Sequence, residues 1–479
     1  MRTPHSWLRS IEVAFVPPSE TMPLAERVWE GLERAFRQCG HRVVPTPQAS
    51  TDIVLTAAPF GEAIPWRTAL LFTMRRRYRL PHMPLLWTIV PVTPERWHVA
   101  LQKLEHALAK ELPDPSDFAF PGLAQTAWRT LIEQGRRGGP ILALQRAIQA
   151  QVKSIRVLLV VGHDYPIEAY LFDLMGGYPR IPADDSFYTD LVLRMATIAS
   201  TYEVTEHQAV GAPIPAKIWQ ALEAPAAMKR AAREFGQRDF FTPGVRISEL
   251  VTVPAVEASI SAQYSEGCFA TWEPALGALV TTITGSARPV AKDAISDDDL
   301  AVIVGVRPDG KGALVRPIEG TRNDPPSSEA VELYDMDSAL PKIAWNGVQV
   351  PVVRSKLHGH RGVRAYDPTQ VEFVPLDPPF YYYPVACATA AQAQAIKTAF
   401  ARSQALQDPE DPRTIVFTVL PCHGVVIVEK WVTGKAPFQA IWEAMDDQNL
   451  VIDALVPQGP FDYELTESGL MVLREPTSA

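Results

Sequence analysis

The N-terminal part of the chain alternates short apolar runs with segments whose apolar residues recur at helical spacing, and this alternation constrains the fold most. Residues 11–16 form an apolar run, 22–38 have the period of an amphipathic helix, and 41–44 form the next run. Thr93 followed by Pro94 predicts the start of a further helix. Strands that alternate with helices predict a parallel sheet covered on both faces. No GxGxxG motif follows the first run, so no dinucleotide site is implied.

The pattern restarts once and then changes character. Residues 155–162 begin a second set of strands and helices, whereas short β-branched runs separated by Asp-Gly, Asn-Gly and Pro turns follow residue 300. A chain of 479 residues is also too long for one core of ordinary size. We therefore expect an α/β protein with two doubly wound parallel-sheet domains followed by a mostly antiparallel β domain, with bounds 1–150, 151–290 and 291–479.

Composition and charge exclude several classes of protein. The net charge of −9 is moderate and spread along the chain, which favours solubility and argues against a nucleic-acid partner. No run approaches the ~20 apolar residues of a membrane helix, and residues 1–10 lack the apolar segment of a signal peptide. Four cysteines lie far apart without CxxC spacing, which excludes a zinc finger and favours the reducing cytoplasm. We expect a soluble cytoplasmic protein with no membrane partner.

Glu266, Asp293 and His423 form the group of residues that we expect to carry the chemistry. Glu266 lies on a predicted turn within residues 264–273, and the segment 421–424 places His423 at the joint between two apolar strands. Two carboxylates and one imidazole, with positions left open for substrate oxygens, suit Mn²⁺ or Mg²⁺. Each residue also has a structural interpretation: a solvated turn for Glu266, a helix-entry acid for Asp293 and a hydrogen-bonded core histidine for His423.

Two further segments are candidates for substrate contacts. His358 and His360 have the His-x-His spacing of many metal ligands, and on a strand both rings would lie on one face. Gly359 instead favours a loop in which the backbone approaches another group closely. The polar, turn-rich segment 319–329 is either a substrate loop or a plain surface hairpin. The residues that we expect to contact substrate are His358, His360, Arg322, Asn323 and Trp272.

The chain resembles the L-fucose/L-arabinose isomerase-like family. Glu266-Gly267, the segment 275–279 and the turn 284–290 look like the family's acid-Gly segment, helix and Thr-Gly turn, which leads to a second acidic ligand. Residues 421–426 resemble its late strand that carries a histidine. In one departure, Lys292 precedes the second acid, whereas in the family this acid follows the turn directly.

The resemblance implies an aldose–ketose isomerase that acts on a small-molecule sugar. Glu266, Asp293 and His423 would hold Mn²⁺ or Mg²⁺ at the C1 and C2 oxygens, and Glu266 or Asp293 would move the proton through an enediol. His358 or His360 would orient the sugar hydroxyls. The resemblance also implies a homo-oligomer. Two alternatives stay open: a non-catalytic carbohydrate-binding or assembly protein on the same scaffold, and a metal-dependent hydrolase or lyase of a polyol-like substrate.

Overall fold

The computed structural model contains both helices and strands, and this confirms the predicted α/β class. The chain divides into two compact units, residues 1–200 with 245–262 and residues 201–244 with 263–479. The structure describes residues 10–18, 20–60, 84–110, 135–136, 139–144, 155–172, 180–199, 206–238, 240–241, 267–284, 292–310, 312–378, 390–421, 423–453, 456 and 461–474.

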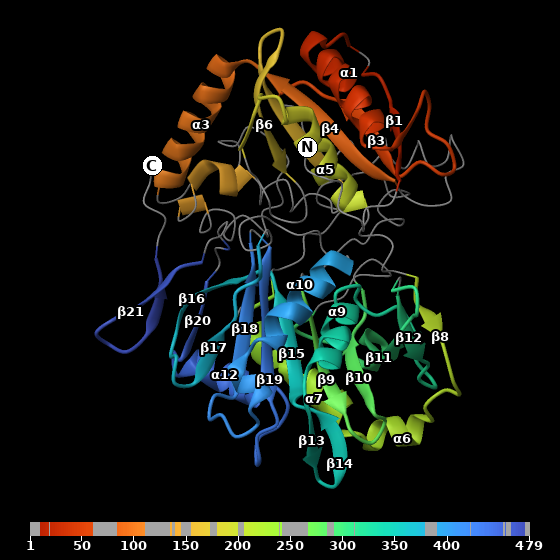
Figure 1. Cartoon of the computed structure of the whole chain (residues 1–479), viewed down its shortest axis with the longest axis vertical. Helices are drawn as coiled ribbons and strands as arrows, with labels where there is room; N and C mark the ends of the chain where they lie inside the picture. Colours follow the sequence, from red (N-terminus) through yellow and green to blue (C-terminus); the bar gives the residue numbers. More distant parts are fainter. Residues whose placement is uncertain are drawn as a thin grey trace. The chain divides into compact units, whose positions relative to one another are not determined.

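Unit 1 is built on a seven-stranded sheet with the order β2-β1-β3-β4-β5-β6-β7 (Figure 1). The strands β1 to β5 run parallel, and β6 and β7 are antiparallel additions at one edge. Helices α1 and α5 pack together, whereas α3 contacts β5. The elements are β1 (Glu12–Phe15), α1 (Pro23–Gln38), β2 (Arg42–Val44), β3 (Ile53–Ala57), β4 (Leu85–Val92), α3 (Pro94–Ala109), β5 (Ile155–Gly162), β6 (Pro166–Phe172), β7 (Arg180–Pro182) and α5 (Phe187–Ala199).

The boundary expected near residue 151 falls inside this unit. Strand β5 pairs along its length with β4, so that Leu86 lies opposite Ile155 and Val92 opposite Val161. A new apolar run has the same sequence pattern whether it joins an existing sheet or opens another, because both leave the strand buried on two faces. The helix predicted from Thr93 is confirmed, since the Thr93 side chain accepts a hydrogen bond from the Arg96 N–H at its N-terminus.

Unit 2 contains a nine-stranded sheet with the order β17-β18-β19-β15-β9-β10-β11-β12-β8, in which the central pairs are antiparallel (Figure 1). The boundary expected near residue 291 lies within this sheet, because β10 pairs with β11. The strands of the sheet are β8 (Gln208–Ala209), β9 (Cys268–Glu273), β10 (Ala278–Thr282), β11 (Leu300–Val306), β12 (Ala313–Arg316), β15 (Val353–Gly359), β17 (Val371–Phe373), β18 (Ile415–Leu420) and β19 (Gly424–Lys430).

Two smaller sheets and several helices complete unit 2. A hairpin pairs β13 with β14, and a four-stranded sheet has the order β20-β16-β22-β21. These strands are β13 (Lys342–Trp345), β14 (Val348–Pro351), β16 (Gly362–Tyr366), β20 (Leu450–Asp453), β21 (Tyr463–Leu465) and β22 (Met471–Leu473). The helices are α6 (Ala216–Ala221), α7 (Glu223–Gln237), α9 (Ala330–Asp335), α10 (Ala390–Ala401), α11 (Gln404–Gln407), α12 (Gln439–Asp446) and the 3₁₀ helices η4 (Asp297–Asp299) and η5 (Met336–Ala339).

The large sheet is covered on both faces. One apolar cluster joins Phe269 and Phe417 of the sheet to Phe235 of α7 and Ile441 of α12. The other cluster joins the opposite face to Leu333 of α9 and to α10. Strands β15 and β19 are therefore buried along their whole length. Polar residues on these strands lie between a sheet and its helices, where each needs a partner.

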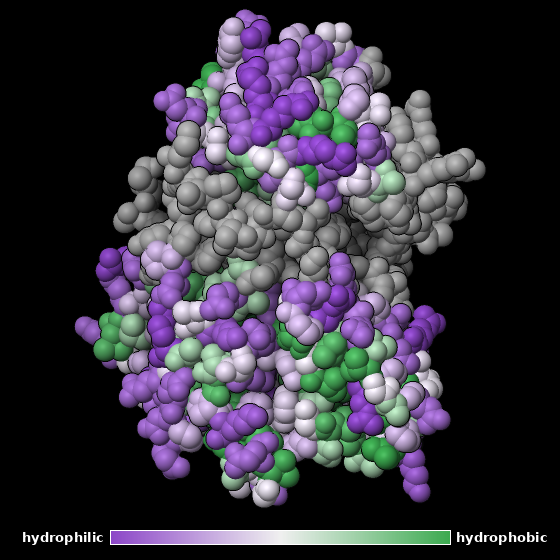
Figure 2. Space-filling model, turned by 45° about the vertical axis from the view of Figure 1, so that its right-hand side comes forward, coloured by the Kyte–Doolittle hydropathy of each residue, from purple (hydrophilic) through white to green (hydrophobic). Residues whose placement is uncertain are grey.

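The surface is mixed in character. On the face shown in Figure 2, hydrophilic side chains cover much of the described surface of both units, and hydrophobic patches gather mainly on unit 2. Among the described helices, none combines the length and the apolar character that crossing a bilayer requires.

Candidate metal centre

Four buried side chains of unit 2 converge on one point. One ligand atom from each of Glu329, His358, His360 and His423 lies within 4.8 Å of the other three. The Nε2 atom of His358 is 3.1 Å from Oε1 of Glu329, and Nε2 of His423 is 3.3 Å from the same oxygen. The Nε2 atoms of His360 and His423 are 3.2 Å apart. We call these four residues the His₃Glu cluster.

The strand pairing of the large sheet brings the three histidines together. His358 is the second-last residue of β15, His360 directly follows this strand, and His423 directly precedes β19, which pairs antiparallel with β15. The register sets Gly359 opposite Val425, so the end of one strand meets the start of the other. Glu329 comes from the residue before α9, the helix that covers this face. The site therefore needs only two neighbouring strands and the start of one helix.

Two glycines allow this close approach. A Cβ atom at Gly424 would lie 2.2 Å from the carbonyl oxygen of Gly359, and one at Gly359 would lie 2.2 Å from the ring of Phe240. Real Cβ atoms do not approach other atoms so closely, so both positions require glycine. This agrees with the expectation from sequence that the backbone at Gly359 lies close to another group.

The hydrogen bond of His358 fixes which of its nitrogens faces the cluster. Nδ1 lies 3.1 Å from the carbonyl oxygen of Val425, and a carbonyl only accepts, so Nδ1 carries the proton. In the neutral ring Nε2 then has a lone pair directed at the Glu329 carboxylate. This Nε2 atom is buried and makes no hydrogen bond of regular geometry among the residues that the structure describes. The arrangement resembles a metal ligand whose other ring nitrogen is held by the backbone.

Burial controls the charge of two members of the cluster. It lowers the pKa of His423 to about 4, and the neighbouring His360 and His358 add to this, while Glu329 opposes it. At neutral pH the ring of His423 is therefore uncharged and able to ligate a metal ion. Burial alone would raise the pKa of Glu329, but the charge and hydrogen bond of a protonated His358, together with those of His423, outweigh it and hold the pKa well below the ordinary range. Glu329 is therefore a carboxylate.

Of the residues expected to form the site, the structure brings together the three histidines. Asp293 is exposed, lies against Gly236 at the end of α7, and is no member of the cluster. Glu266 lies outside the described residues. The next residue, Gly267, packs against the backbone of His358, where a Cβ atom would lie 2.3 Å from the carbonyl oxygen.

The remaining expected contacts lie elsewhere in unit 2. Asn323 has a positive φ of 56° and binds Ile318 through both its amide oxygen and its amide nitrogen, so it shapes a turn. Arg322 is exposed, and its N–H donates to Asp298. Trp272 is half-buried on β9 and packs against Tyr334 of α9. None of these three belongs to the His₃Glu cluster.

Sequence reasoning missed Glu329 as a ligand. It is the last residue of the polar segment 319–329, which the sequence singled out as a candidate substrate loop. No spacing motif connects Glu329 to His358, because the contact arises from the packing of a helix on a sheet. The sequence offered one signal for Glu329, which is its place at the end of a polar segment, directly before the residues that form α9.

No protein-family model, curated protein or solved structure matches this chain. The resemblance to the isomerase-like family therefore rests on the residues quoted above.

The geometry of the cluster fits a transition-metal ion. Bonds of about 2.0–2.2 Å place tetrahedral ligand atoms about 3.3–3.6 Å apart and neighbouring octahedral ones about 2.8–3.1 Å apart. Three of the separations, 3.1, 3.2 and 3.3 Å, lie at or between these values, and all four ligand atoms lie within 4.8 Å of one another. Three imidazoles suit zinc, iron, nickel or copper, whereas Mg²⁺ prefers oxygen. The donor set is thus richer in nitrogen than the expected pair of carboxylates with one histidine.

Proposed function

We propose that this chain is a metalloprotein that binds one divalent transition-metal ion through Glu329, His358, His360 and His423. One observation carries the proposal: Nε2 of His358, which carries a lone pair in the neutral ring, lies 3.1 Å from an oxygen of Glu329 in a buried setting. Two acceptors at that distance repel each other unless a proton or a cation lies between them. An ion bound to all four residues removes the repulsion and satisfies every ligand atom at once.

The proposed ion is zinc or ferrous iron, with Mn²⁺ as the next candidate. Imidazole nitrogens bind the later ions of the first transition series more strongly than they bind Mn²⁺ or Mg²⁺. A divalent ion with one carboxylate leaves the centre with one net positive charge. Such a centre attracts an anionic or strongly polar oxygen of a substrate.

As the activity we propose the interconversion of an aldose and a ketose. If the four protein ligands leave two positions of the ion open, these would take the C1 and C2 oxygens of an open-chain sugar, and the ion would stabilise charge on them. His423 supports this proposal, because it belongs both to the cluster and to the strand that resembles the isomerase-like family. Glu266, which lies outside the described residues, stays the proposed base on the ground of the resemblance alone.

Metal content and coordination test the centre. We expect the purified protein to contain about one equivalent of ion, and His423→Ala and Glu329→Gln to lose it while keeping the circular dichroism spectrum of the parent. Asp293→Asn is the matched control, because it removes a carboxylate that the sequence suggested but that lies outside the cluster. If this control loses the ion as completely as Glu329→Gln does, or if both cluster variants retain it, the proposed ligand set is wrong.

Cobalt substitution and a sugar panel test the activity. Weak visible bands of the Co²⁺ form would indicate a six-coordinate ion with open positions, whereas intense bands would indicate a closed, four-coordinate structural site. We expect weak bands and conversion of at least one aldose, detected by ketose formation. A closed site, or metal-loaded protein that converts no sugar, would exclude the isomerase. Binding of sugars without conversion would then favour the carbohydrate-binding alternative, and cleavage of a polyol-like compound would favour the hydrolase or lyase.

A further inference from the structure

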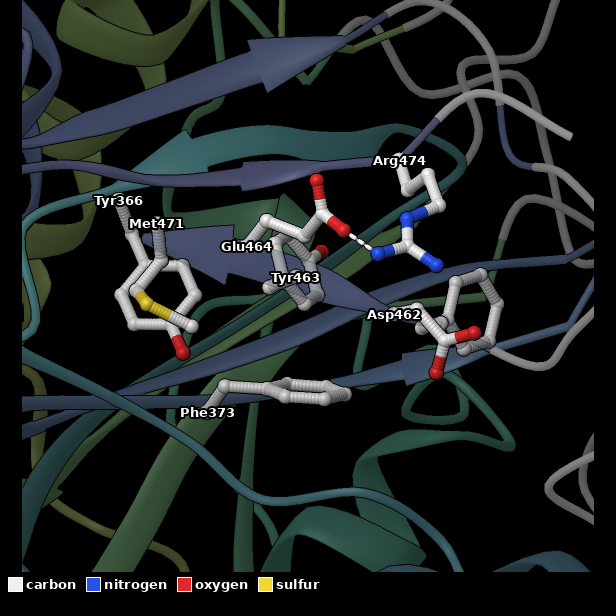
Figure 3. A pocket seen from close by; sticks show the side chains of 8 residues that line it. Tyr366, Phe373, Asp462, Tyr463, Glu464, Met471 and Arg474 are labelled. Atoms are coloured by element: carbon white, nitrogen blue, oxygen red, sulfur yellow. Dashed lines mark ion pairs between the residues drawn. The ribbon is translucent and has the colours of Figure 1, made fainter. Parts of the chain in front are cut away.

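Two pockets differ in the groups that line them. In unit 2 the rings of Tyr366, Phe373 and Tyr463 line one pocket and pack against one another (Figure 3). Glu464 and Arg474 of the same lining form an ion pair. These aromatic and charged groups are therefore engaged with one another. The pocket of unit 1 instead combines buried apolar side chains with charged groups of both signs.

The pocket of unit 1 lies at the carboxyl ends of parallel strands. It has a volume of about 330 Å³, at the lower end of the range for small-molecule sites. Residues of the segments 20–24 and 59–60 line it, and these segments follow β1 and β3. Residues of the segments 91–96 and 162–164, at the ends of β4 and β5, complete the lining. Segments from four neighbouring strands of one sheet therefore meet at this pocket.

The strand order makes this edge of the sheet a place where ligands bind. The chain passes from β1 through α1 to β2 on one side of β1, whereas β3, β4 and β5 lie on the other side. The segments that follow β1 and β3 therefore diverge. Open parallel sheets bind ligands in the crevice that such a divergence leaves at the carboxyl ends of the strands.

Buried apolar side chains form part of the lining. Leu24 at the start of α1 and Val92 at the end of β4 are 6% and 3% exposed, and Pro59 and Pro91 also line the pocket. A ligand with an apolar body would cover these side chains and displace water from them. A small inorganic ion would leave them uncovered.

Three charged side chains of the lining have room for further partners. The guanidinium of Arg96 donates through Nη2 to the carbonyl of Phe60 at 3.3 Å, and its Nε and Nη1 make no hydrogen bond among the residues that the structure describes. Glu20 and Asp164 are exposed, and neither carboxylate has a hydrogen bond or an ion pair within the described ranges. The lining therefore presents one guanidinium and two carboxylates.

We propose that this pocket binds a small zwitterion with an apolar body, of which an α-amino acid with an apolar side chain is the simplest form. Its carboxylate would pair with Arg96, and its ammonium with Glu20 or Asp164. Its side chain would cover Leu24 and Val92. The volume of the pocket suits a molecule of this size.

Other classes of ligand fit this lining less well. A phosphate group would meet the two carboxylates, and residues 16–22 between β1 and α1 include no glycine at which the backbone could wrap around it. A metal ion would find no ready set of ligands, because Glu20 and Asp164 belong to no candidate metal group among the described residues.

Amino acids and their derivatives test the two charges of the ligand. We expect calorimetry on the full chain to show binding of at least one of valine, leucine, methionine and phenylalanine. The amide of that amino acid lacks the carboxylate, and its N-acetyl derivative lacks the ammonium, so each should bind at least ~3-fold more weakly, as the loss of one exposed ion pair predicts. Binding of none of the four, or equally tight binding of either derivative, would overturn the proposal.

Variants assign each charge to its partner. Arg96→Gln should weaken binding of the amino acid by about 3- to 5-fold and leave binding of its amide unchanged, because the amide has no carboxylate to lose a partner. The double variant Glu20→Gln/Asp164→Asn should likewise weaken binding of the amino acid and leave that of the N-acetyl derivative unchanged. If Arg96→Gln weakens binding of the amide as much as that of the amino acid, Arg96 does not hold the carboxylate and the proposal falls.

Lys103→Gln and Asp185→Asn are the matched controls. Each removes an exposed charge of unit 1 that does not line the pocket, so binding should match that of the parent. A loss in these controls as large as in the pocket variants would show that general charge and not this pocket attracts the ligand. Unchanged metal content in every variant keeps this test separate from that of the metal centre.

Discussion

Lys356 and His358 lie two residues apart on β15, and their side chains contact opposite ends of α9. The ammonium of Lys356 donates to the carbonyl of Leu333 at 2.5 Å, and Nε2 of His358 lies 3.1 Å from Glu329. Two residues of a strand span about 6.6–6.8 Å, and four residues of a helix span about 6 Å. The spacing of Lys356 and His358 along β15 therefore matches the spacing of Leu333 and Glu329 on the neighbouring segment. Lys356 therefore sets the position of α9, and with it that of Glu329, relative to the histidines.

This relationship predicts the effect of removing Lys356. The side chain is fully buried and forms an ion pair with Asp337 at 2.5 Å. Lys356→Met should lower the free energy of unfolding by about 3–5 kcal/mol, because it leaves a buried carboxylate without its partner. The double variant Lys356→Met/Asp337→Leu should recover most of this loss, since two apolar groups replace two charges.

Urea unfolding and metal affinity separate the two roles of Lys356. The double variant should regain stability yet bind the ion more weakly than the parent, because the hydrogen bond to Leu333 that positions α9 is still absent. If the double variant is as unstable as Lys356→Met alone, the ion pair does not explain the stability. If it binds metal as tightly as the parent, Lys356 does not position Glu329.

Gly359 and Phe240 form a steric pair behind the cluster. Gly359→Ala would bring a methyl group to 2.2 Å from the ring, so the strand between His358 and His360 must shift. We expect a loss of about 1–3 kcal/mol in stability, as for other overpacked sites, together with weaker metal binding. Adding Phe240→Ala should restore metal binding, even though the cavity that it creates costs stability of its own. A double variant that binds metal no better than Gly359→Ala would show that the clash lies elsewhere.

Much of the fold was predictable because it depends on local patterns. Apolar runs such as 155–162 and the cap at Thr93 are properties of neighbouring residues, and the structure contains the corresponding strand β5 and helix α3. Sheet membership was not predictable in this way. Whether residues 155–162 join β4 or open another sheet depends on contacts between segments far apart in the sequence.

The site shows the same division. Two local signals pointed to the histidines: the place of His423 at a joint between apolar strands, and the spacing of His358 and His360. In the structure all three rings lie in one cluster. The carboxylate is different, because an acid in a polar turn has the same appearance whether it faces solvent or the sheet. Asp293 is exposed and Glu329 is buried, and only the packing of α9 on β15 separates them.

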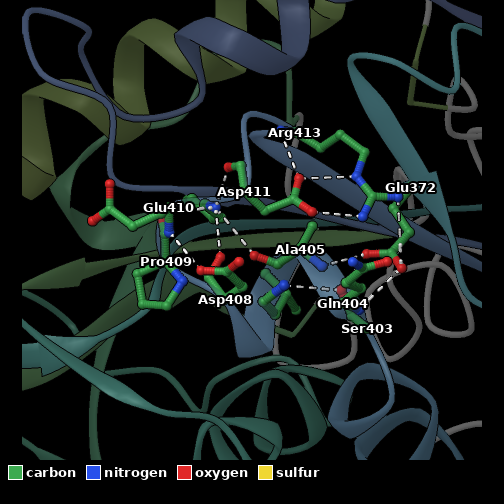
Figure 4. A network of polar contacts seen from close by, with 11 residues as sticks. Glu372, Ser403, Gln404, Ala405, Asp408, Pro409, Glu410, Asp411 and Arg413 are labelled. Carbon is green, nitrogen blue, oxygen red and sulfur yellow. Dashed lines mark hydrogen bonds and ion pairs between the residues drawn. The ribbon is translucent and has the colours of Figure 1, made fainter.

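Lys430 occupies a site formed by backbone carbonyls. Its ammonium lies 2.8–3.3 Å from the carbonyl oxygens of Ala405, Asp408, Pro409 and Asp411, in the network shown in Figure 4. Lys430→Ala should lower the free energy of unfolding by about 2–4 kcal/mol, because partly buried acceptors lose a charged donor. The vacated space would be lined by oxygens that suit a small cation.

Methylammonium should therefore rescue Lys430→Ala. We expect millimolar methylammonium chloride to raise the melting temperature of this variant while leaving that of the parent unchanged, with tetramethylammonium chloride as the control that has no N–H donor. Equal effects of both salts, or an equal rise in the parent, would argue that the carbonyl groups do not form a cation site.

Glu429 predicts a dependence of stability on pH. Its carboxylate lies on the face of β19 toward α12 and accepts hydrogen bonds from Ser355 Oγ at 3.2 Å, Phe438 N at 3.0 Å and Ile441 N at 3.3 Å. Burial raises its pKa to about 7 in spite of these donors. Between the ordinary value of about 4.5 and 7, the folded protein holds a proton that the unfolded chain has released. The contribution of Glu429 to stability therefore falls as pH rises through this window.

Replacing Glu429 by glutamine removes this titration, so the comparison of the two proteins isolates it. The free energy of unfolding of Glu429→Gln relative to the parent should rise by at most about 3 kcal/mol between pH 4.5 and 7 and then level off, since one pKa unit corresponds to about 1.4 kcal/mol. The absolute difference also contains the amide's poorer match to the N–H of Ile441, but that part does not vary with pH.

Urea unfolding at intervals of half a pH unit measures the slope. Glu443→Gln on α12 is the control: hydrogen bonds from Lys435 and Gln439 lower the pKa of Glu443, so its contribution is lost only as pH falls below about 4.5, and the difference for this variant should stay level between pH 4.5 and 7. A flat difference for Glu429→Gln would mean that the carboxylate is already ionised at pH 5, held by the N-terminus of α12.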